Sequence, residues 1–218
     1  VMTINTFSWS DLETFYEFTR RSFEQMKAAG TQTLVIDVRK NGGGDDVMWL
    51  EGLLPYLADK PYRWASRYIK KVVKADPTKN ERLGDVIEGN IDRWIAPVPD
   101  NPLHFSGQVY VLAGPATYSS AILFANTMQD FGFALIAGTG GSARSKQSGG
   151  TQKIALSNTG LVLVSPRFLL TRPSGSAVPY YLEPDLKVED SAFNPNMAVD
   201  AVLQRSAAKS RAKTADEH

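Results

Sequence analysis

The feature that most constrains this chain is a strand-like apolar segment that ends in a run of glycines. Residues 33–38 are almost continuously apolar, which is typical of a parallel strand covered on both faces. Asn41 and Gly42, Gly43 and Gly44 follow, and a second apolar segment begins near Val47. Consecutive glycines can adopt positive φ and present backbone N–H groups with no side chain in the way. The pattern predicts a strand-to-helix loop that can bind a polarised oxygen, with a tight turn as the alternative.

Helix-like and strand-like patterns alternate along the rest of the chain. They predict helices over 11–29, 46–58, 119–131 and near 197–203, and strands over 1–7, 33–38, 108–112, 134–137, 151–156, 161–165 and 168–171. Ser10 and Glu13 have the spacing of a capping box at the start of the first helix. The alternation predicts an α/β fold with a mostly parallel sheet, flanking helices and right-handed crossovers.

One core domain is predicted over residues 1–206. Within it, residues 60–105 are rich in charge, tryptophan and proline. We interpret them as a lid or excursion packed by its own aromatic side chains, with a substrate-contacting cap as the alternative. Residues 207–218 are rich in alanine, lysine and arginine and are predicted to be a flexible tail.

Composition excludes several classes of function. The net charge is +1, from 24 basic and 23 acidic residues, which argues against nucleic acid as the main partner. Without cysteine there is no disulfide, thiolate metal site or cysteine nucleophile, and no cofactor or metal is predicted. No apolar run approaches the roughly 20 residues that span a bilayer. The amino-terminal residues have the pattern of a strand and not of a signal peptide, as expected of an excised domain or a processed product.

Ser119 is the candidate nucleophile. It follows residues 114–118 and precedes the apolar segment 121–125, which places it at the first turn of a buried helix. Free N–H groups and a partial positive charge at a helix N-terminus stabilise an alkoxide or a nearby oxyanion. The N–H groups of Gly42, Gly43 and Ser120 are therefore the candidate oxyanion donors. The alternative is that Ser119 only caps the helix.

A serine hydroxyl needs a base before it can attack a carbonyl group. The chain has two histidines, His104 in a loop and His218 at the last position, and neither is predicted to serve. Lys146, which follows the glycine-rich loop, is the candidate base, as in Ser–Lys enzymes. A phosphate loop is not predicted near Gly42, because the required motifs are missing and Asp45 and Asp46 would repel a phosphate.

Five blocks, taken in order, resemble the S41 peptidases, which are the tail-specific or C-terminal processing proteases and their tricorn-like relatives. They are the D-x-R-x-N-x-G-G block at 34–44, the nucleophile segment at 109–121, the helix and strand at 124–138, and the closing blocks at 156–161 and 182–185. The resemblance spans nearly the whole chain and is weakest over residues 60–105. It implies a crotonase-like or ClpP-like α/β core, a nucleophile at Ser119 and a peptide or protein substrate.

The chain departs from the family pattern at the base. The lysine of the processing proteases would fall at Arg144, and arginine stays protonated. Tricorn-like relatives use a histidine upstream of the region seen here, and the PDZ domain of many relatives is missing. The leading hypothesis is thus a serine endopeptidase core whose base is Lys146 or lies upstream.

Two other functions stay open at this point. One is a catalytically inactive S41-like module that holds a peptide or an apolar ligand, which Arg144 favours. The other is a crotonase-like acyl-CoA enzyme, which shares the implied fold. The relatives suggest a periplasmic or secreted location, and homo-oligomerisation stays open.

Overall fold

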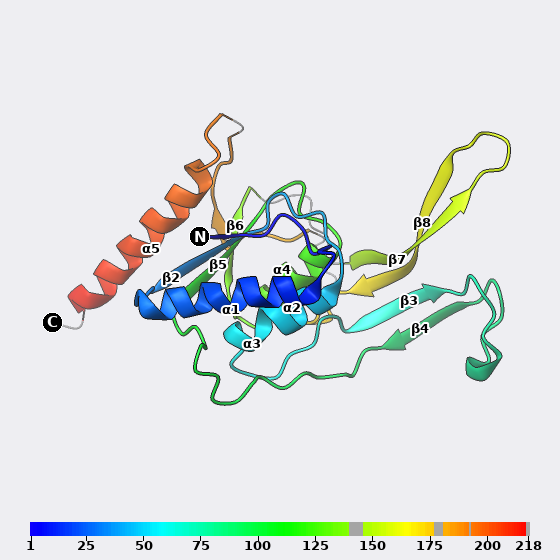
Figure 1. The fold of residues 1–218 in the computed structure, drawn as a ribbon, viewed down its shortest axis with the longest axis horizontal. Coiled ribbons are helices and arrows are strands. Elements are labelled where there is room, and N and C mark those ends of the chain that lie inside the picture. The colour runs from blue at the N-terminus through cyan, green and yellow to red at the C-terminus, as the bar shows by residue number, and fades with distance from the viewer. Residues whose placement is uncertain (140–145, 177–180, 192, 217–218) are drawn as a thin grey trace.

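The computed structural model describes residues 1–139, 146–176, 181–191 and 193–216, with the side chains of 146 and 209–216 excepted. Within these residues the chain forms a parallel sheet covered by helices and a second, antiparallel sheet that extends away from it (Figure 1). None of the helices in the described part is long and apolar enough to cross a bilayer.

The parallel sheet confirms the predicted α/β class. Its strand order is β1-β2-β5-β6-β9 and every neighbouring pair is parallel. The strands are β1 (Met2–Thr3), β2 (Thr33–Asp37), β5 (Gln108–Ala113), β6 (Leu135–Gly138) and β9 (Leu186–Lys187). Leu34 and Ile36 of β2 belong to one hydrophobic core and Val35 to another, so both faces of the strand are buried, as the continuous apolar run predicts.

Helices cover the two faces of this sheet. They are α1 (Leu12–Ala28), α2 (Asp46–Gly52), α3 (Leu54–Leu57), α4 (Ser120–Asp130) and α5 (Met197–Asp216). The larger core joins one face of the sheet to α1–α4, and Val199 and Val202 of α5 pack on the other face (Figure 1).

Three helix boundaries differ from the sequence prediction. Asp11, not Ser10, caps α1, because its carboxylate accepts the N–H groups of Glu13 and Thr14. The single helix predicted over 46–58 is broken into α2 and α3, because Pro55 has no N–H to donate and stands in the first turn of α3. Helix α5 continues through the predicted tail, whose alanine, lysine and arginine residues are strong helix formers.

The second sheet was not predicted. Its order is β4-β3-β8-β7, all antiparallel, with β3 (Arg67–Lys71), β4 (Val86–Asn90), β7 (Lys146–Ala155) and β8 (Val162–Thr171). The three short strands predicted over 151–171 are in fact parts of β7 and β8. Pro166, which lies between two of these predicted strands, pairs with Thr151 inside the ladder. The strand accommodates this proline because the pairing of β8 with β3 ends at Phe168, so the missing N–H falls on an open edge.

Arg172 joins the antiparallel sheet to the end of α4. It follows β8 and donates from Nη2 to Asp130 Oδ1 at 2.6 Å and from Nε to Asp130 Oδ2 at 3.1 Å. The two side chains are only 5% and 8% exposed. Arg172 also donates to Gln129 Oε1 at 2.9 Å. This buried ion pair fixes the position of β8 relative to α4.

Replacing Arg172 with methionine is expected to destabilise the fold by about 3 kcal/mol, because the Asp130 carboxylate is left buried without its partner. Urea unfolding followed by circular dichroism measures the change. The matched control is Arg20→Met, which removes solvent-screened ion pairs to Glu17 and Glu24 on the exposed face of α1 and is expected to cost far less stability than Arg172→Met. Equal losses in the two variants would contradict the buried pair as the cause.

Candidate active site

The loops that follow β2 and β5 meet at one edge of the parallel sheet. Thr117 Oγ1 donates to the Val38 carbonyl at 2.8 Å, and the Tyr118 N–H donates to the Asn41 carbonyl at 3.0 Å. Neighbouring parallel strands end at the same edge of a sheet, where open α/β folds bind their ligands. The pairing of β2 with β5 therefore brings the triglycine loop to the start of α4.

Ser119 has a strained backbone at this meeting point. Its φ is 53° and its ψ is −124°, and it immediately precedes α4. The other non-glycine residues with positive φ in the described part are Asn80 and Asp100, residue types that tolerate this region. A serine there costs on the order of 1–3 kcal/mol, and such strain clusters at active sites.

Gly43 packs directly against this serine. A Cβ added to Gly43 would lie 2.6 Å from the Ser119 Cβ, 2.8 Å from the Tyr118 carbonyl oxygen and 2.9 Å from the Ser120 nitrogen. Gly43 also has a φ of 100°. The structure therefore brings together two of the elements that the sequence proposes for one site, and glycine at position 43 is what allows the approach.

The three glycines are not equivalent as hydrogen-bond donors. The Gly43 N–H donates to the Asn41 side-chain Oδ1 at 2.8 Å, so this predicted oxyanion donor is already used within the loop. Gly44, which the sequence analysis did not single out as a donor, lines the cavity beside Ser119, whereas Gly42 is exposed and does not. The Asn41 amide also donates to the Ile4 carbonyl at 3.0 Å, which ties the loop to the first strand region.

The D-x-R part of the same block also has a structural role. Asp37 is 8% exposed and accepts Nε and Nη2 of Arg39, at 3.0 Å and 2.7 Å. These hydrogen bonds, which Asp37 accepts, raise the pKa of Arg39 and keep it charged. Arg39 reaches on to Asp190 at 2.7 Å and so ties the loop to the segment after β9.

A cavity of about 450 Å³ opens beside Ser119. Asp46, Ser119 and Ser120 contribute polar groups from the parallel-sheet half of the molecule, and most of the apolar lining comes from the antiparallel sheet and the residues next to it. The lining consists of Gly44, Asp46, Trp64, Tyr68, Ile91, Ser119, Ser120, Leu123, Ser148, Gly149, Gly150, Phe168 and Leu170. The hydroxyl oxygens of Tyr118 and Ser148 lie 3.4 Å apart, so the loop that precedes α4 contacts β7 next to the cavity.

Ser120 and Asp46 form a polar pair in this cavity. The Ser120 hydroxyl donates to Asp46 Oδ1, and the buried Trp49 Nε1 donates to the Ser120 Oγ at 2.9 Å. Burial raises the pKa of Asp46, and the Ser120 hydrogen bond opposes this. The sequence analysis considered Asp46 only as a group that repels phosphate. Its placement in the first turn of an apolar helix, three residues before Trp49, is the signal that could have drawn attention to it.

The candidate bases are placed as follows. Lys146 begins β7, two residues before the cavity-lining Ser148. Arg144 and the loop around it lie outside the described residues. His104 is exposed and lies before β5, at the opposite end of that strand from Ser119, and the position of His218 is likewise not described.

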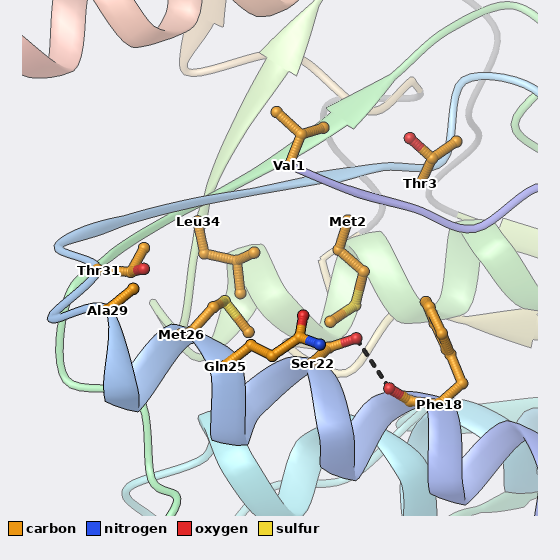
Figure 2. A pocket seen from close by; sticks show the side chains of 10 residues that line it. All are labelled: Val1, Met2, Thr3, Phe18, Ser22, Gln25, Met26, Ala29, Thr31 and Leu34. Carbon is orange, nitrogen blue, oxygen red and sulfur yellow. Dashed lines mark hydrogen bonds between the residues drawn. The ribbon is translucent and has the colours of Figure 1, made fainter.

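A second cavity of about 350 Å³ lies between β1 and α1 (Figure 2). Ser22 points its hydroxyl at the Phe18 carbonyl, 2.8 Å away, and Met2, Met26 and Leu34 supply apolar surface. None of the lining side chains is acidic or basic. No side chain that lines this cavity can therefore act as a base for a hydroxyl nucleophile.

Solved structures with a similar fold include a putative peptidase and a processing protease. Mature CPAF complexed with lactacystin superposes with a TM-score of 0.67 at 18% identity, over 94% of this chain and 49% of that one. A putative peptidase from Parabacteroides merdae gives 0.58 at 15% identity, over 94% and 59%. The photosystem II D1 C-terminal processing protease gives 0.55 at 18% identity, over 90% and 44%. This chain thus spans about half the length of these structures.

No curated protein matches the sequence. The family model of peptidase family S41 matches residues 1–188, which is most of the chain and contains both loops of the site. On this match, the chain belongs to peptidase family S41.

Proposed function

We propose that this chain is the catalytic core of a serine endopeptidase with Ser119 as its nucleophile. The observation that carries the proposal is the contact of Gly43 with a strained Ser119 at the N-terminus of α4. Such a turn exposes a serine hydroxyl above the end of a parallel sheet, as in other serine hydrolases. The adjoining cavity provides a place for the substrate.

The proposed reaction is acyl transfer from a peptide to Ser119 and then to water. Ser119 Oγ attacks the carbonyl carbon while its proton passes to the base, and the base then gives a proton to the leaving amine. The N–H groups of Ser120 and Gly44 stabilise the oxyanion. Gly44 takes the place first predicted for Gly43, whose N–H is bonded to Asn41. Water then hydrolyses the acyl-enzyme and regenerates the serine.

A fluorophosphonate probe tests the nucleophile. The wild-type protein is expected to be labelled at Ser119, and the Ser119→Ala variant is expected to remain unlabelled. Mass spectrometry of the labelled peptide separates Ser119 from Ser120. A wild-type protein that is not labelled, or a Ser119→Ala variant labelled as well as wild type, would contradict the proposal.

Lys146 is the proposed base. Lys146→Arg is expected to lower kcat/KM for peptide hydrolysis by ~10²–10⁴-fold, because arginine stays protonated at neutral pH. The pH profile of kcat/KM measures the effect, and the wild-type profile should show a basic limb that the variant lacks. Arg144→Lys is the matched variant. If Arg144→Lys raises activity and Lys146→Arg does not lower it, Lys146 is not the base, and only a lysine introduced at position 144 can supply one.

An inactive ligand-binding module is the second candidate. The apolar wall of the cavity and arginine at position 144 favour it. It predicts peptide binding without fluorophosphonate labelling. A periplasmic or secreted location stays a prediction from the family resemblance.

A further inference from the structure

The cavity beside Ser119 contains an acidic group that the proposed reaction does not use. Asp46 is the one charged residue among the described residues that line it. Asp46 is partly buried, and in the described part of the chain no lysine, arginine or histidine lies within ion-pair distance of its carboxylate. A desolvated carboxylate without a cation is costly, so natural proteins usually pair it.

The carboxylate is also held in a fixed orientation. It accepts the hydroxyl of Ser120, and that hydroxyl is oriented in turn by the indole N–H of Trp49. Trp49 is fully buried and Ser120 is 2% exposed. Both supporting groups are therefore rigid, as a recognition site requires.

The apolar lining of the cavity that contains Asp46 suits a long cationic side chain. Trp64, Tyr68 and Phe168 are aromatic, and the faces of aromatic rings attract cations. Ile91, Leu123 and Leu170 add aliphatic surface against which a methylene chain can pack. A volume of about 450 Å³ is in the range of small-ligand pockets and accommodates one large side chain.

We propose that this cavity is a specificity pocket for a lysine or arginine side chain of the substrate, with the cation bound at Asp46 and the methylene chain against the aromatic wall. An acidic residue in a specificity pocket selects basic substrates by the same electrostatics in trypsin. The inference rests on the proposed peptide substrate, but it concerns binding and not the chemistry at Ser119.

Binding to the Ser119→Ala variant tests the pocket without catalysis. The probes are two acetylated tetrapeptide amides that differ at one position, lysine in one and norleucine in the other, measured by titration calorimetry. Norleucine has the methylene chain of lysine without the ammonium group. The lysine peptide is expected to bind at least tenfold more tightly. Equal affinities, or tighter binding of norleucine, would overturn the proposal.

Asp46→Asn in the same background is expected to remove the difference between the two peptides while leaving norleucine binding within about twofold. The matched control is Asp45→Asn, because Asp45 is exposed and asparagine also caps a helix, and this variant should retain the lysine preference. Equal loss of binding of both peptides in Asp46→Asn would show that Asp46 maintains the shape of the pocket and would overturn its role as a cation site.

The stability of Asp46→Asn provides a check on folding. Burial raises the pKa of Asp46 in the folded state, so its contribution to stability is present below the unfolded pKa and is lost as the pH rises through the folded one. Removing the charge should therefore leave Tm at pH 7 equal to or above that of wild type. A marked fall in Tm would contradict an uncompensated carboxylate.

Failure of the pocket and failure of the peptidase proposal remain distinguishable. If fluorophosphonate labels Ser119 but the lysine peptide binds no more tightly than the norleucine peptide, the peptidase proposal is supported and the specificity pocket is rejected. If the Ser119→Ala variant prefers the lysine peptide but the wild-type protein is not labelled, the specificity pocket is supported and Ser119 is rejected as the nucleophile.

Discussion

Replacing Ser119 with alanine is expected to lower kcat/KM for peptide hydrolysis by at least ~10⁴-fold, because the oxyanion donors alone cannot supply the covalent step. Alanine and serine meet the same steric restriction at the φ of 53°, so the variant should fold with nearly unchanged stability. Hydrolysis of a quenched fluorescent peptide measures the rate, and thermal unfolding checks the fold.

Ser22→Ala is the matched control for this substitution. Ser22 lies in α1, its hydroxyl bonds to the Phe18 carbonyl, and it lines the cavity that has no basic or acidic side chain. Its replacement should leave the hydrolysis rate within about twofold of wild type. If Ser119→Ala retains more than a tenth of the wild-type rate, Ser119 is not the nucleophile, which must be sought elsewhere.

Replacing Gly43 with alanine is expected to destabilise the fold by about 4 kcal/mol and to remove labelling of Ser119. The new methyl group would lie 2.6 Å from the Ser119 Cβ and 2.8 Å from the Tyr118 carbonyl oxygen. The φ of 100° adds backbone strain for any residue with a side chain. The triglycine loop and the loop before α4 must move apart to relieve the clash, and the turn at Ser119 then loses its packing against Gly43. Urea unfolding gives the loss of stability, and the fluorophosphonate probe reports the site.

Two other glycines separate the causes of this effect. Gly42 has no neighbour within 4 Å of an added Cβ and no positive φ, so Gly42→Ala should change stability by less than about 0.5 kcal/mol. Gly30 ends α1 with a φ of 61° and also has open space around it, so Gly30→Ala should show the cost of positive φ alone, about 1 kcal/mol. A cost for Gly43→Ala no greater than that for Gly30→Ala would mean that the contact with Ser119 is loose.

Local signals were sufficient for the family and for the strands β1, β2, β5 and β6 of the parallel sheet, whereas the short strand β9 was not predicted. The continuous apolar run at 33–38 required a strand buried on both sides, and residues 34 to 36 alternate between two cores as expected. The glycines and the serine were recognisable because their chemistry depends on residue type and local position. The family match over residues 1–188 agrees with the order of blocks along the chain.

Sequence alone was insufficient for the antiparallel sheet and for the lining of the cavity. The strands β3 and β4 lie in a segment where apolar and polar residues alternate only weakly. Strand β8 continues through Pro166 because its pairing with β3 ends at Phe168, while its pairing with β7 continues. Whether a proline breaks a strand depends on the neighbouring strand, which lies far away in the sequence.

The amino-acid sequence by itself determined which residues can do chemistry here, because a bare N–H group, a hydroxyl and a carboxylate are properties of single residues. The tertiary structure decided which of them share a cavity and which are already bonded. The Gly43 N–H donates to Asn41 Oδ1, and Asp46 lines one cavity together with Tyr68 and Phe168 of the other sheet. Such assignments depend on distances between segments that are remote along the chain, and these distances are set by packing and not by local pattern.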